Sequence, residues 1–244
     1  MKIVKYFIQF LLIMFLFGAF KILGFKFSKI LSGSLMIIFG RFFRSKDVIF
    51  SNLSRAFPNL NEIEKKKILE KMWFNYGKIF AEYVFIKNFR KKPSSLINIS
   101  IENPNILENI KMNSEPVIFV SGHFNNFELM AMEIERSGID LAAIYRPLNN
   151  PFLNPFMEKI RKKYICKKQI KKGISGTKQL LENFKNGTSI ALMIDQRVSQ
   201  GIRCNFFGDQ ALTTTIPAQF VKKFNAKIIP VYINRSNDKS FKIT

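Results

Sequence analysis

The chain has 244 residues, of which 47% are hydrophobic, so it is long and apolar enough to bury a core and is not disordered. Its 39 Lys and Arg against 17 Asp and Glu leave a net charge of +22, which favours anionic partners: nucleic acid, an anionic membrane surface or phosphorylated substrates. A solvated basic surface with no special partner is the alternative. One His and two Cys without metal-ligand spacing indicate neither a zinc site nor a disulfide framework.

The N-terminal segment is apolar enough to reach a membrane. Residues 6–20 carry no charge, and beyond Lys21 the apolar run continues to residue 25, a span of about 20 residues that can cross a bilayer. Lys2 and Lys5 also suit a cleaved signal peptide, but no small-x-small cleavage site follows. Basic and bulky apolar residues are then interleaved, as is typical of a membrane interface. We predict an uncleaved anchor or monotopic insertion over residues 1–25.

Interfacial and amphipathic helices are expected over residues 26–95. After Phe57-Pro58, Asn61 and Glu64 form a capping-box pattern that predicts a helix start. Apolar residues at helical spacing extend this helix over about 62–87. Its aromatic stripe is expected to face the core or the membrane rather than a ligand.

Residues 96–244 show alternating strand and helix patterns and are expected to form an α/β core. Strands are predicted at 117–120, 141–145, 189–195 and 227–233. Helices are predicted at 126–136 (ending at Gly138), from about 155 through Arg161, at 177–185 and at 216–224. Single helices between strands imply right-handed crossovers, so we predict a mostly parallel sheet flanked by helices. A site then belongs in the loops after Val120, Tyr145 and Ile194.

The only histidine of the sequence, His123, follows the first of these strands. Histidine is the side chain best suited to accept and return a proton near neutral pH. Glu128, five residues later, can meet it only if His123 lies in a loop and Glu128 in the first turn of the next helix. Gly122 gives the loop freedom, and Asn125 or Asn126 can cap that helix. An unrelated His and Glu at this spacing is the alternative.

The segment from Ser121 to Leu129 resembles the His-x4-Asp/Glu motif of glycerolipid-type acyltransferases. It is most similar to the lipid A late acyltransferases, the lauroyl and myristoyl transferase branch. Five further blocks resemble that family in the same order. They are residues 52–58 (Asn-Leu…Phe-Pro), the helix with Gly77 and Glu82, residues 145–150 (Tyr-Arg-Pro), residues 193–196 (Asp-Gln) and residues 206–218 (Phe-Phe-Gly…Thr-Thr…Pro-Ala).

The resemblance implies hydroxyl acylation. His123 would be the general base and Glu128 would orient the imidazole. Arg161 would stabilise the oxyanion or bind a phosphate, and Arg146 would bind acceptor phosphate or pair with an acid to fix its loop. The expected substrate-binding residues are Phe124, Asn125, Asn126, Tyr145, Arg146, Pro147, Arg161, Asp195 and Gln196. No cofactor and no metal are expected.

The resemblance also implies partners and a location. The acyl donor would be acyl carrier protein or CoA, the acceptor a lipid A precursor, and the site the cytoplasmic face of the bacterial inner membrane. Members of the family continue past Thr244, so we expect the chain to be C-terminally truncated. Two alternatives stay open: an O-acyltransferase for another glycolipid or a lysophospholipid, and a non-catalytic basic membrane protein. Nucleic acid is not expected, because no recognition motif accompanies the charge.

Overall fold

The computed structural model describes residues 1–91 and 93–244. The chain divides into two compact units, and each contains more than one segment. The first unit holds Met1–Leu11, Asn88–Ile202 and Leu212–Thr244. The second unit holds Leu12–Lys87 and Arg203–Ala211.

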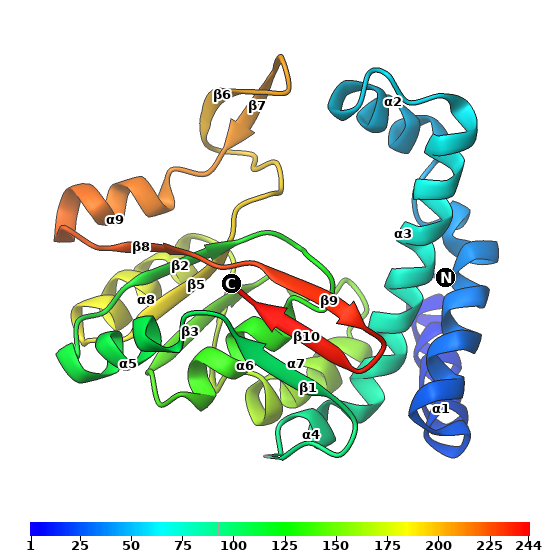
Figure 1. The fold of residues 1–244 in the computed structure, drawn as a ribbon, viewed down its shortest axis with the longest axis horizontal. Helices are drawn as coiled ribbons and strands as arrows, with labels where there is room; N and C mark the ends of the chain where they lie inside the picture. Colours follow the sequence, from blue (N-terminus) through cyan, green and yellow to red (C-terminus); the bar gives the residue numbers. More distant parts are fainter. Residues whose placement is uncertain (92) are drawn as a thin grey trace. The chain divides into compact units, whose positions relative to one another are not determined.

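The first unit is built on a five-stranded parallel sheet (Figure 1). Its order is β4-β3-β5-β2-β8. The strands are β2 (Ile118–Ser121), β3 (Leu141–Tyr145), β4 (Lys168–Lys171), β5 (Ser189–Met193) and β8 (Ile228–Pro230). The predicted mostly parallel sheet is confirmed. The sequence pattern misses the edge strand β4, because only Ile170 among its four residues is buried.

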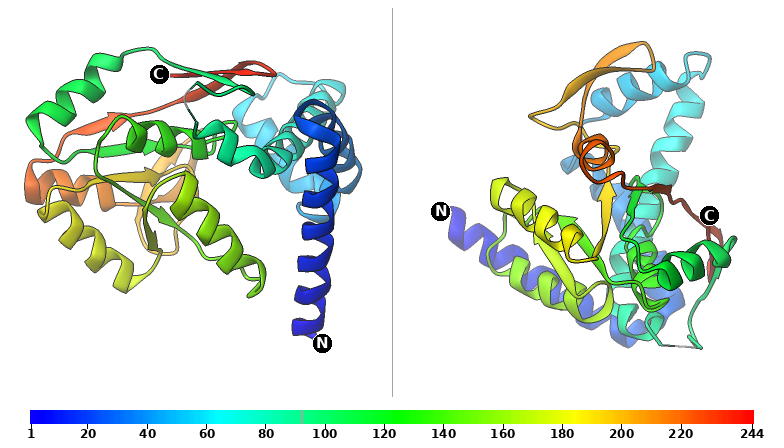
Figure 2. Two further views of the ribbon diagram at one scale, coloured as in Figure 1. Left: turned by 90° about the horizontal axis from the view of Figure 1, so that it is seen from below. Right: turned by 90° about the vertical axis from the view of Figure 1, so that its left-hand side faces the viewer.

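Helices connect the strands and flank the sheet (Figure 2). They are α5 (Pro104–Asn113), α6 (Glu128–Arg136), α7 (Leu153–Tyr164), α8 (Ile174–Lys185) and α9 (Ile216–Phe224). Given the strand order, right-handed crossovers place α6 and α7 on one face and α8 and α9 on the other. The core between sheet and helices includes Phe184 of α8 and Phe220 of α9, whose rings meet edge to face at 5.1 Å.

A second, smaller sheet in the first unit has the order β1-β10-β9. Its strands are β1 (Asn98–Ile101), β9 (Ile233–Asn237) and β10 (Ser240–Ile243). The predicted strand at 227–233 is therefore split between two sheets. Val231 still donates its N–H to Val120 in the large sheet, whereas Tyr232 already exchanges both backbone hydrogen bonds with Thr244.

The second unit is mainly helical. It holds most of α1 (Lys2–Phe39), the short helix η1 (Gly40–Phe42), α2 (Lys46–Ala56), α3 (Glu62–Glu82), η2 (Tyr83–Phe85), the start of α4 (Ile86–Phe89) and most of the β6 (Ile202–Phe206) and β7 (Asp209–Thr213) hairpin. The capping box is confirmed, because Glu64 N–H donates to Asn61 Oδ1 at 3.0 Å and Asn61 N–H donates to Glu64 Oε2 at 2.9 Å. The predicted helix 62–87 ends earlier, at Glu82, and continues as a 3₁₀ turn.

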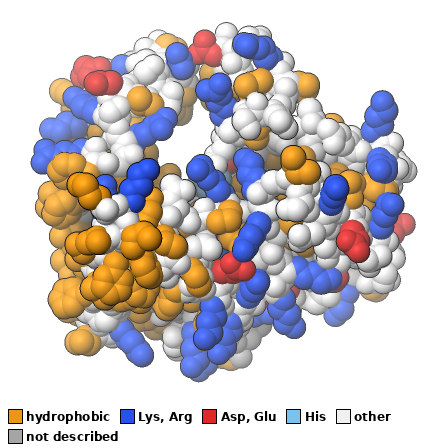
Figure 3. Space-filling view, turned by 180° about the vertical axis from the view of Figure 1, so that it is seen from behind, with side chains coloured by type: hydrophobic (Ala, Val, Ile, Leu, Met, Phe, Trp, Pro, Cys, Tyr) orange, Lys and Arg blue, Asp and Glu red, His pale blue; other side chains and the backbone are white. Residues whose placement is uncertain are grey.

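Helix α1 consists of two helical arms separated at Gly24, whose φ of 74° and ψ of 172° are not helical. Among the described residues, Lys2–Phe42 is the one stretch of helix long and apolar enough to cross a membrane. Only 11% of its most apolar window is buried. The space-filling view shows many exposed hydrophobic side chains gathered on this part of the molecule (Figure 3).

Candidate active site

The parallel pairing of β2 and β5 brings two predicted site residues together. Ser121 at the end of β2 is in register with Met193 at the end of β5. Each strand is followed two residues later by a polar side chain, His123 and Asp195. Because parallel strands end at the same edge of a sheet, residues 72 positions apart in the sequence become neighbours.

Asp195 holds His123 at two points. Its Oδ2 accepts the backbone N–H of His123 at 2.7 Å, and its Oδ1 lies 2.8 Å from Nδ1 of the imidazole. Gly122 leaves room for this approach, because a Cβ at that position would lie 3.0 Å from the Phe124 ring and 3.1 Å from Asp195 Oδ2 and would push these side chains back. One carboxylate therefore fixes both the loop and the ring, and it favours the tautomer in which Nδ1 carries the proton.

The rest of the imidazole is partly enclosed. The ring of Phe127 meets it edge to face at a centroid distance of 4.6 Å. The amide Nε2 of Gln196 lies 3.5 Å from Nε2 of His123, at the outer limit of a hydrogen bond. The side chain of His123 keeps 29% of its surface exposed. Its Nε2 is therefore the nitrogen that can meet a substrate hydroxyl.

Glu128 lies in the first turn of α6, as predicted, and forms an ion pair with Arg161. Arg161 of α7 donates to Glu128 Oε1 from Nε at 2.8 Å and from Nη2 at 2.6 Å. Nδ1 of His123 contacts Asp195, so a carboxylate outside the His-x4-Glu segment also takes part in holding the imidazole. Glu128 is only 7% exposed, and a buried carboxylate is stabilised by a charged partner such as Arg161.

The residues between His123 and Glu128 shape the loop. Phe124 is 42% exposed and its ring packs edge to face on Tyr232 at 4.7 Å. Asn125 adopts a left-handed φ of 44° and donates from Nδ2 to the Ile233 carbonyl at 3.3 Å. Asn126 is buried, and its carbonyl accepts the N–H of Leu129. The predicted Asn cap is not formed, since Phe127 occupies the N-cap position without a side-chain cap.

The Tyr-Arg-Pro block lies at the end of β3, beside α7. Tyr145 is buried, and burial together with the nearby Glu158 carboxylate raises its pKa to about 12. Arg146 is exposed and Pro147 is half-buried. Sequence reasoning did not single out Glu158, although its position three residues before Arg161 on α7 is a usable signal.

The loop that follows is fixed by Asn150. Its Oδ1 accepts the N–H groups of Phe152 and Leu153 at 3.0 and 3.1 Å. Its Nδ2 donates to the carbonyl of Tyr6 at 2.7 Å. Three predicted segments, the Gly-His loop, the Tyr-Arg-Pro block and the Asp-Gln strand end, thus lie at the carboxyl edge of the sheet in the first unit.

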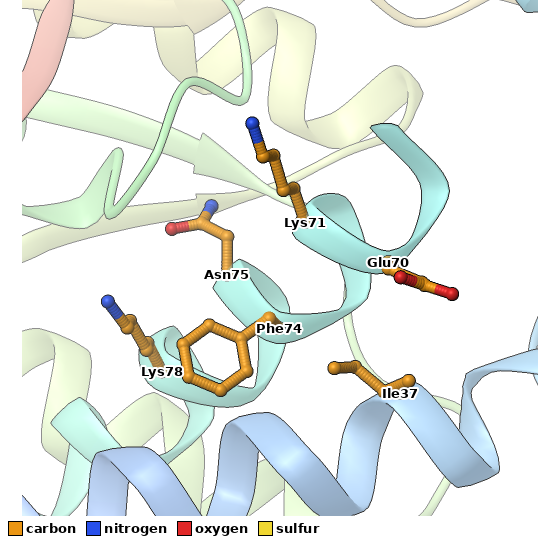
Figure 4. A pocket seen from close by; sticks show the side chains of 6 residues that line it. All are labelled: Ile37, Glu70, Lys71, Phe74, Asn75 and Lys78. Atoms are coloured by element: carbon orange, nitrogen blue, oxygen red, sulfur yellow. The ribbon is translucent and has the colours of Figure 1, made fainter. Parts of the chain in front are cut away.

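Other features lie away from His123. Within the described residues, no group of three or more His, Cys, Asp and Glu side chains is placed to hold a metal ion. A cavity of about 370 Å³ in the second unit has Phe74 and Ile37 on one side, while Lys71, Asn75 and Lys78 project from one face of α3 (Figure 4). His123 does not line this cavity.

A parallel α/β sheet with a carboxylate-bound histidine at its carboxyl edge suits proton-transfer chemistry on a bound substrate. The family model for bacterial lipid A biosynthesis acyltransferases matches residues 1–244. The chain belongs to this family, and the resemblance stated from its motifs is confirmed. It is therefore an acyltransferase. No curated protein matches the sequence.

Proposed function

We propose that the chain is a membrane-bound late acyltransferase that moves a fatty acyl group from a thioester donor to a hydroxyl of a lipid A precursor. The observation that supports this most is the contact of His123 with Asp195, in a family that acylates lipid A. Because Asp195 holds Nδ1, the other ring nitrogen, Nε2, is the one proposed to act as the general base.

The proposed reaction is a direct transfer. Nε2 of His123 takes the proton of the acceptor hydroxyl as the oxygen attacks the thioester carbonyl. The carbon–sulfur bond then breaks, and the imidazolium returns its proton to the leaving thiolate. Asp195 acts as a positioning residue that holds the ring and stabilises its cationic form.

Arg161 and Glu128 are proposed to set the substrate side of the site. Glu128 neutralises Arg161 and ties α6 to α7, which fixes the position at which α6 begins. Arg161 is proposed to stabilise the oxyanion or to bind a phosphate through its guanidinium group. Phe124, Asn125, Asn126, Tyr145, Arg146, Pro147 and Gln196 remain proposed substrate-binding residues.

Membrane attachment through α1 and a cytoplasmic catalytic core at the bacterial inner membrane are part of the proposal. Two features support this. The exposed apolar side chains of α1 favour the acyl-chain region of a lipid layer, and the net charge of +22 favours anionic headgroups. The same positive charge suits an acidic acyl carrier protein as the acyl donor. CoA is the alternative donor.

The test is acyl transfer by the parent chain and by His123→Ala, both in lipid vesicles. We expect His123→Ala to lose transfer and to stay bound to the vesicles. Complementation of a strain that lacks its late acyltransferase, followed by mass spectrometry of lipid A, would identify the acceptor and chain length. Transfer at the parent rate by His123→Ala would overturn the mechanism.

A further inference from the structure

The two arms of α1 are each held by different parts of the protein. In the first arm, the Tyr6 carbonyl accepts Asn150 Nδ2 at 2.7 Å. The rings of Phe7 and Phe10 pack against Phe152 at centroid distances of 5.4 and 6.2 Å. Asn150 also bonds two backbone N–H groups at the start of α7. The beginning of α1 is therefore part of the α/β unit.

The second arm is held by α3. Ser32 Oγ donates to the Gly77 carbonyl at 2.7 Å, and Phe25 packs edge to face on Phe85 at 5.4 Å. A Cβ on Gly77 would lie 2.3 Å from the Ser32 carbonyl oxygen, so the two helices are in backbone contact. This arm cannot leave α3 without losing these contacts.

The length that remains between these attachments is too short to cross a bilayer. From Leu12 to the break at Gly24 the helix rises about 18 Å, and the second arm, Phe25–Phe39, rises about 22 Å. The hydrocarbon core of a bilayer is about 30 Å thick. With its first turns bound to the core, the helix does not reach the opposite leaflet before it breaks.

The exposed side chains of the first arm form a stripe along its length. Val4, Ile8, Leu11, Phe15 and Ile22 recur at helical spacing and each is at least 49% exposed. Tyr6, Phe10, Ile13, Phe17 and Phe20, at the same spacing, are half-buried or buried. One side of the arm therefore meets protein and the other is apolar and exposed, over its whole length.

We propose that α1 lies along the membrane surface in a single leaflet, so that the N-terminus stays on the same side of the bilayer as the catalytic core. The occupant of the apolar stripe is acyl-chain lipid, and Lys2, Lys5 and Lys21 suit anionic headgroups along the same arm. This inference rests on the proposed membrane attachment. Of the two forms expected for residues 1–25, an uncleaved anchor or a monotopic insertion, it selects the monotopic one.

Labelling with a membrane-impermeant maleimide tests the proposal in sealed vesicles of both orientations. The background is Cys204→Ser, because Cys166 is buried. The test site is Lys2→Cys, with Lys5→Cys as a second site, and Ile174→Cys (84% exposed on α8) marks the side of the core. We expect Lys2→Cys and Ile174→Cys to react from the same side. Reaction of Lys2→Cys from the opposite side would overturn the proposal.

Depth measurement gives an independent answer that does not need a cysteine background. Val4→Trp, Phe15→Trp and Ile22→Trp are compared in vesicles with lipids quenching at shallow or deep positions, after subtraction of the parent signal from Trp73. If the helix lies in the plane of the membrane, the three tryptophans should lie at equal depths. A depth that changes steadily from position 4 to position 22 would contradict this orientation. Acyl transfer is assayed on the same variants, so graded depth with full activity would reject the orientation alone. Recovery of the parent in the soluble fraction would reject both the orientation and the membrane attachment.

Discussion

At the scale of single residues, His123 depends on a carboxylate that comes from another strand. Asp195 binds its backbone N–H and its Nδ1 together, so the ring and its loop are fixed relative to β5. Gly122 leaves room for Asp195 beside this loop. The orientation of the His123 ring is thus set by a residue that follows a neighbouring strand.

Asp195→Asn keeps the shape of this side chain but removes its charge. We expect kcat to fall by about 10²- to 10⁴-fold with a small change in KM, because the amide favours the wrong tautomer and does not stabilise the imidazolium. Asp209→Asn, an exposed aspartate in the hairpin, is the matched control and should keep parent kcat. Equal rates for the two variants would argue against the proposed role of Asp195.

Arg161→Met tests the buried ion pair. The Glu128 carboxylate would lose two hydrogen bonds in a buried place, and we expect the free energy of unfolding to fall by about 3–5 kcal/mol. Adding Glu128→Gln should recover part of this loss, because the buried negative charge is then gone. Chemical unfolding in detergent compares the parent, Arg161→Met and the double variant. A loss below about 0.5 kcal/mol for Arg161→Met would mean that the pair contributes little to stability.

At the scale of elements, the carboxyl ends and the amino ends of the strands in the parallel sheet differ in their chemistry. The carboxyl edge holds His123 and Asp195. Near the amino ends of β3, β4 and β5, Asp140 accepts hydrogen bonds from Lys168 Nζ at 2.6 Å and Thr188 Oγ1 at 2.7 Å. The residues at the carboxyl ends are expected to serve catalysis, and those at the amino ends are expected to stabilise the fold.

The Asp140 cluster predicts a pH effect on stability. Burial alone would raise the Asp140 pKa, but the hydrogen bonds from Lys168 and Thr188 outweigh it and lower the pKa below 3.8. The stabilisation is therefore present above pH 3.8 and is lost as the pH falls through the lower folded-state value. In Asp140→Asn, the free energy of unfolding should depend less on pH below pH 3.8 than it does in the parent. The acyl transfer rate at neutral pH should be unchanged. Because the carboxylate is half exposed, the effect should be about 1 kcal/mol or less.

The contact between α1 and α3 predicts a packing effect at Gly77. In Gly77→Ala the new Cβ meets backbone atoms of Ser32 and Gly33, which cannot rotate away as a side chain can. We expect a loss of about 1–3 kcal/mol in the free energy of unfolding. Gly18→Ala, where the Cβ meets nothing within 4 Å, is the matched control and should be neutral or slightly stabilising. Equal stability of both variants would contradict the packing.

Local patterns predict the interior of this fold better than its edges. The strands β2, β3 and β5 and the start of α3 follow from apolar runs and a capping box, which are short-range signals. The edge strand β4 is mostly polar, and β1 pairs with residues near the other end of the chain, so neither leaves a local pattern. The same reason explains the site: the His123 and Glu128 positions follow from one segment, whereas the contact with Asp195 depends on the register of β2 against β5.

At the scale of the whole molecule, the excess of positive charge predicts a salt effect. If acyl carrier protein is the donor, KM for the acylated carrier should rise as ionic strength increases from about 50 to about 500 mM, since screening weakens attraction between the acidic carrier and the basic chain. We expect kcat to stay constant. A short uncharged acyl thioester is the control donor, and the same salt dependence with it would argue against charge attraction.

The pairing of β1 with β10 has a consequence for synthesis of the protein. The two strands are parallel neighbours, yet they lie about 140 residues apart in the sequence, so β10 leaves the ribosome long after β1. Until then β1 presents an unpaired edge to other chains. We expect nascent chains that have not yet reached residue 240 to aggregate or recruit chaperones, even when the five-stranded sheet has already formed.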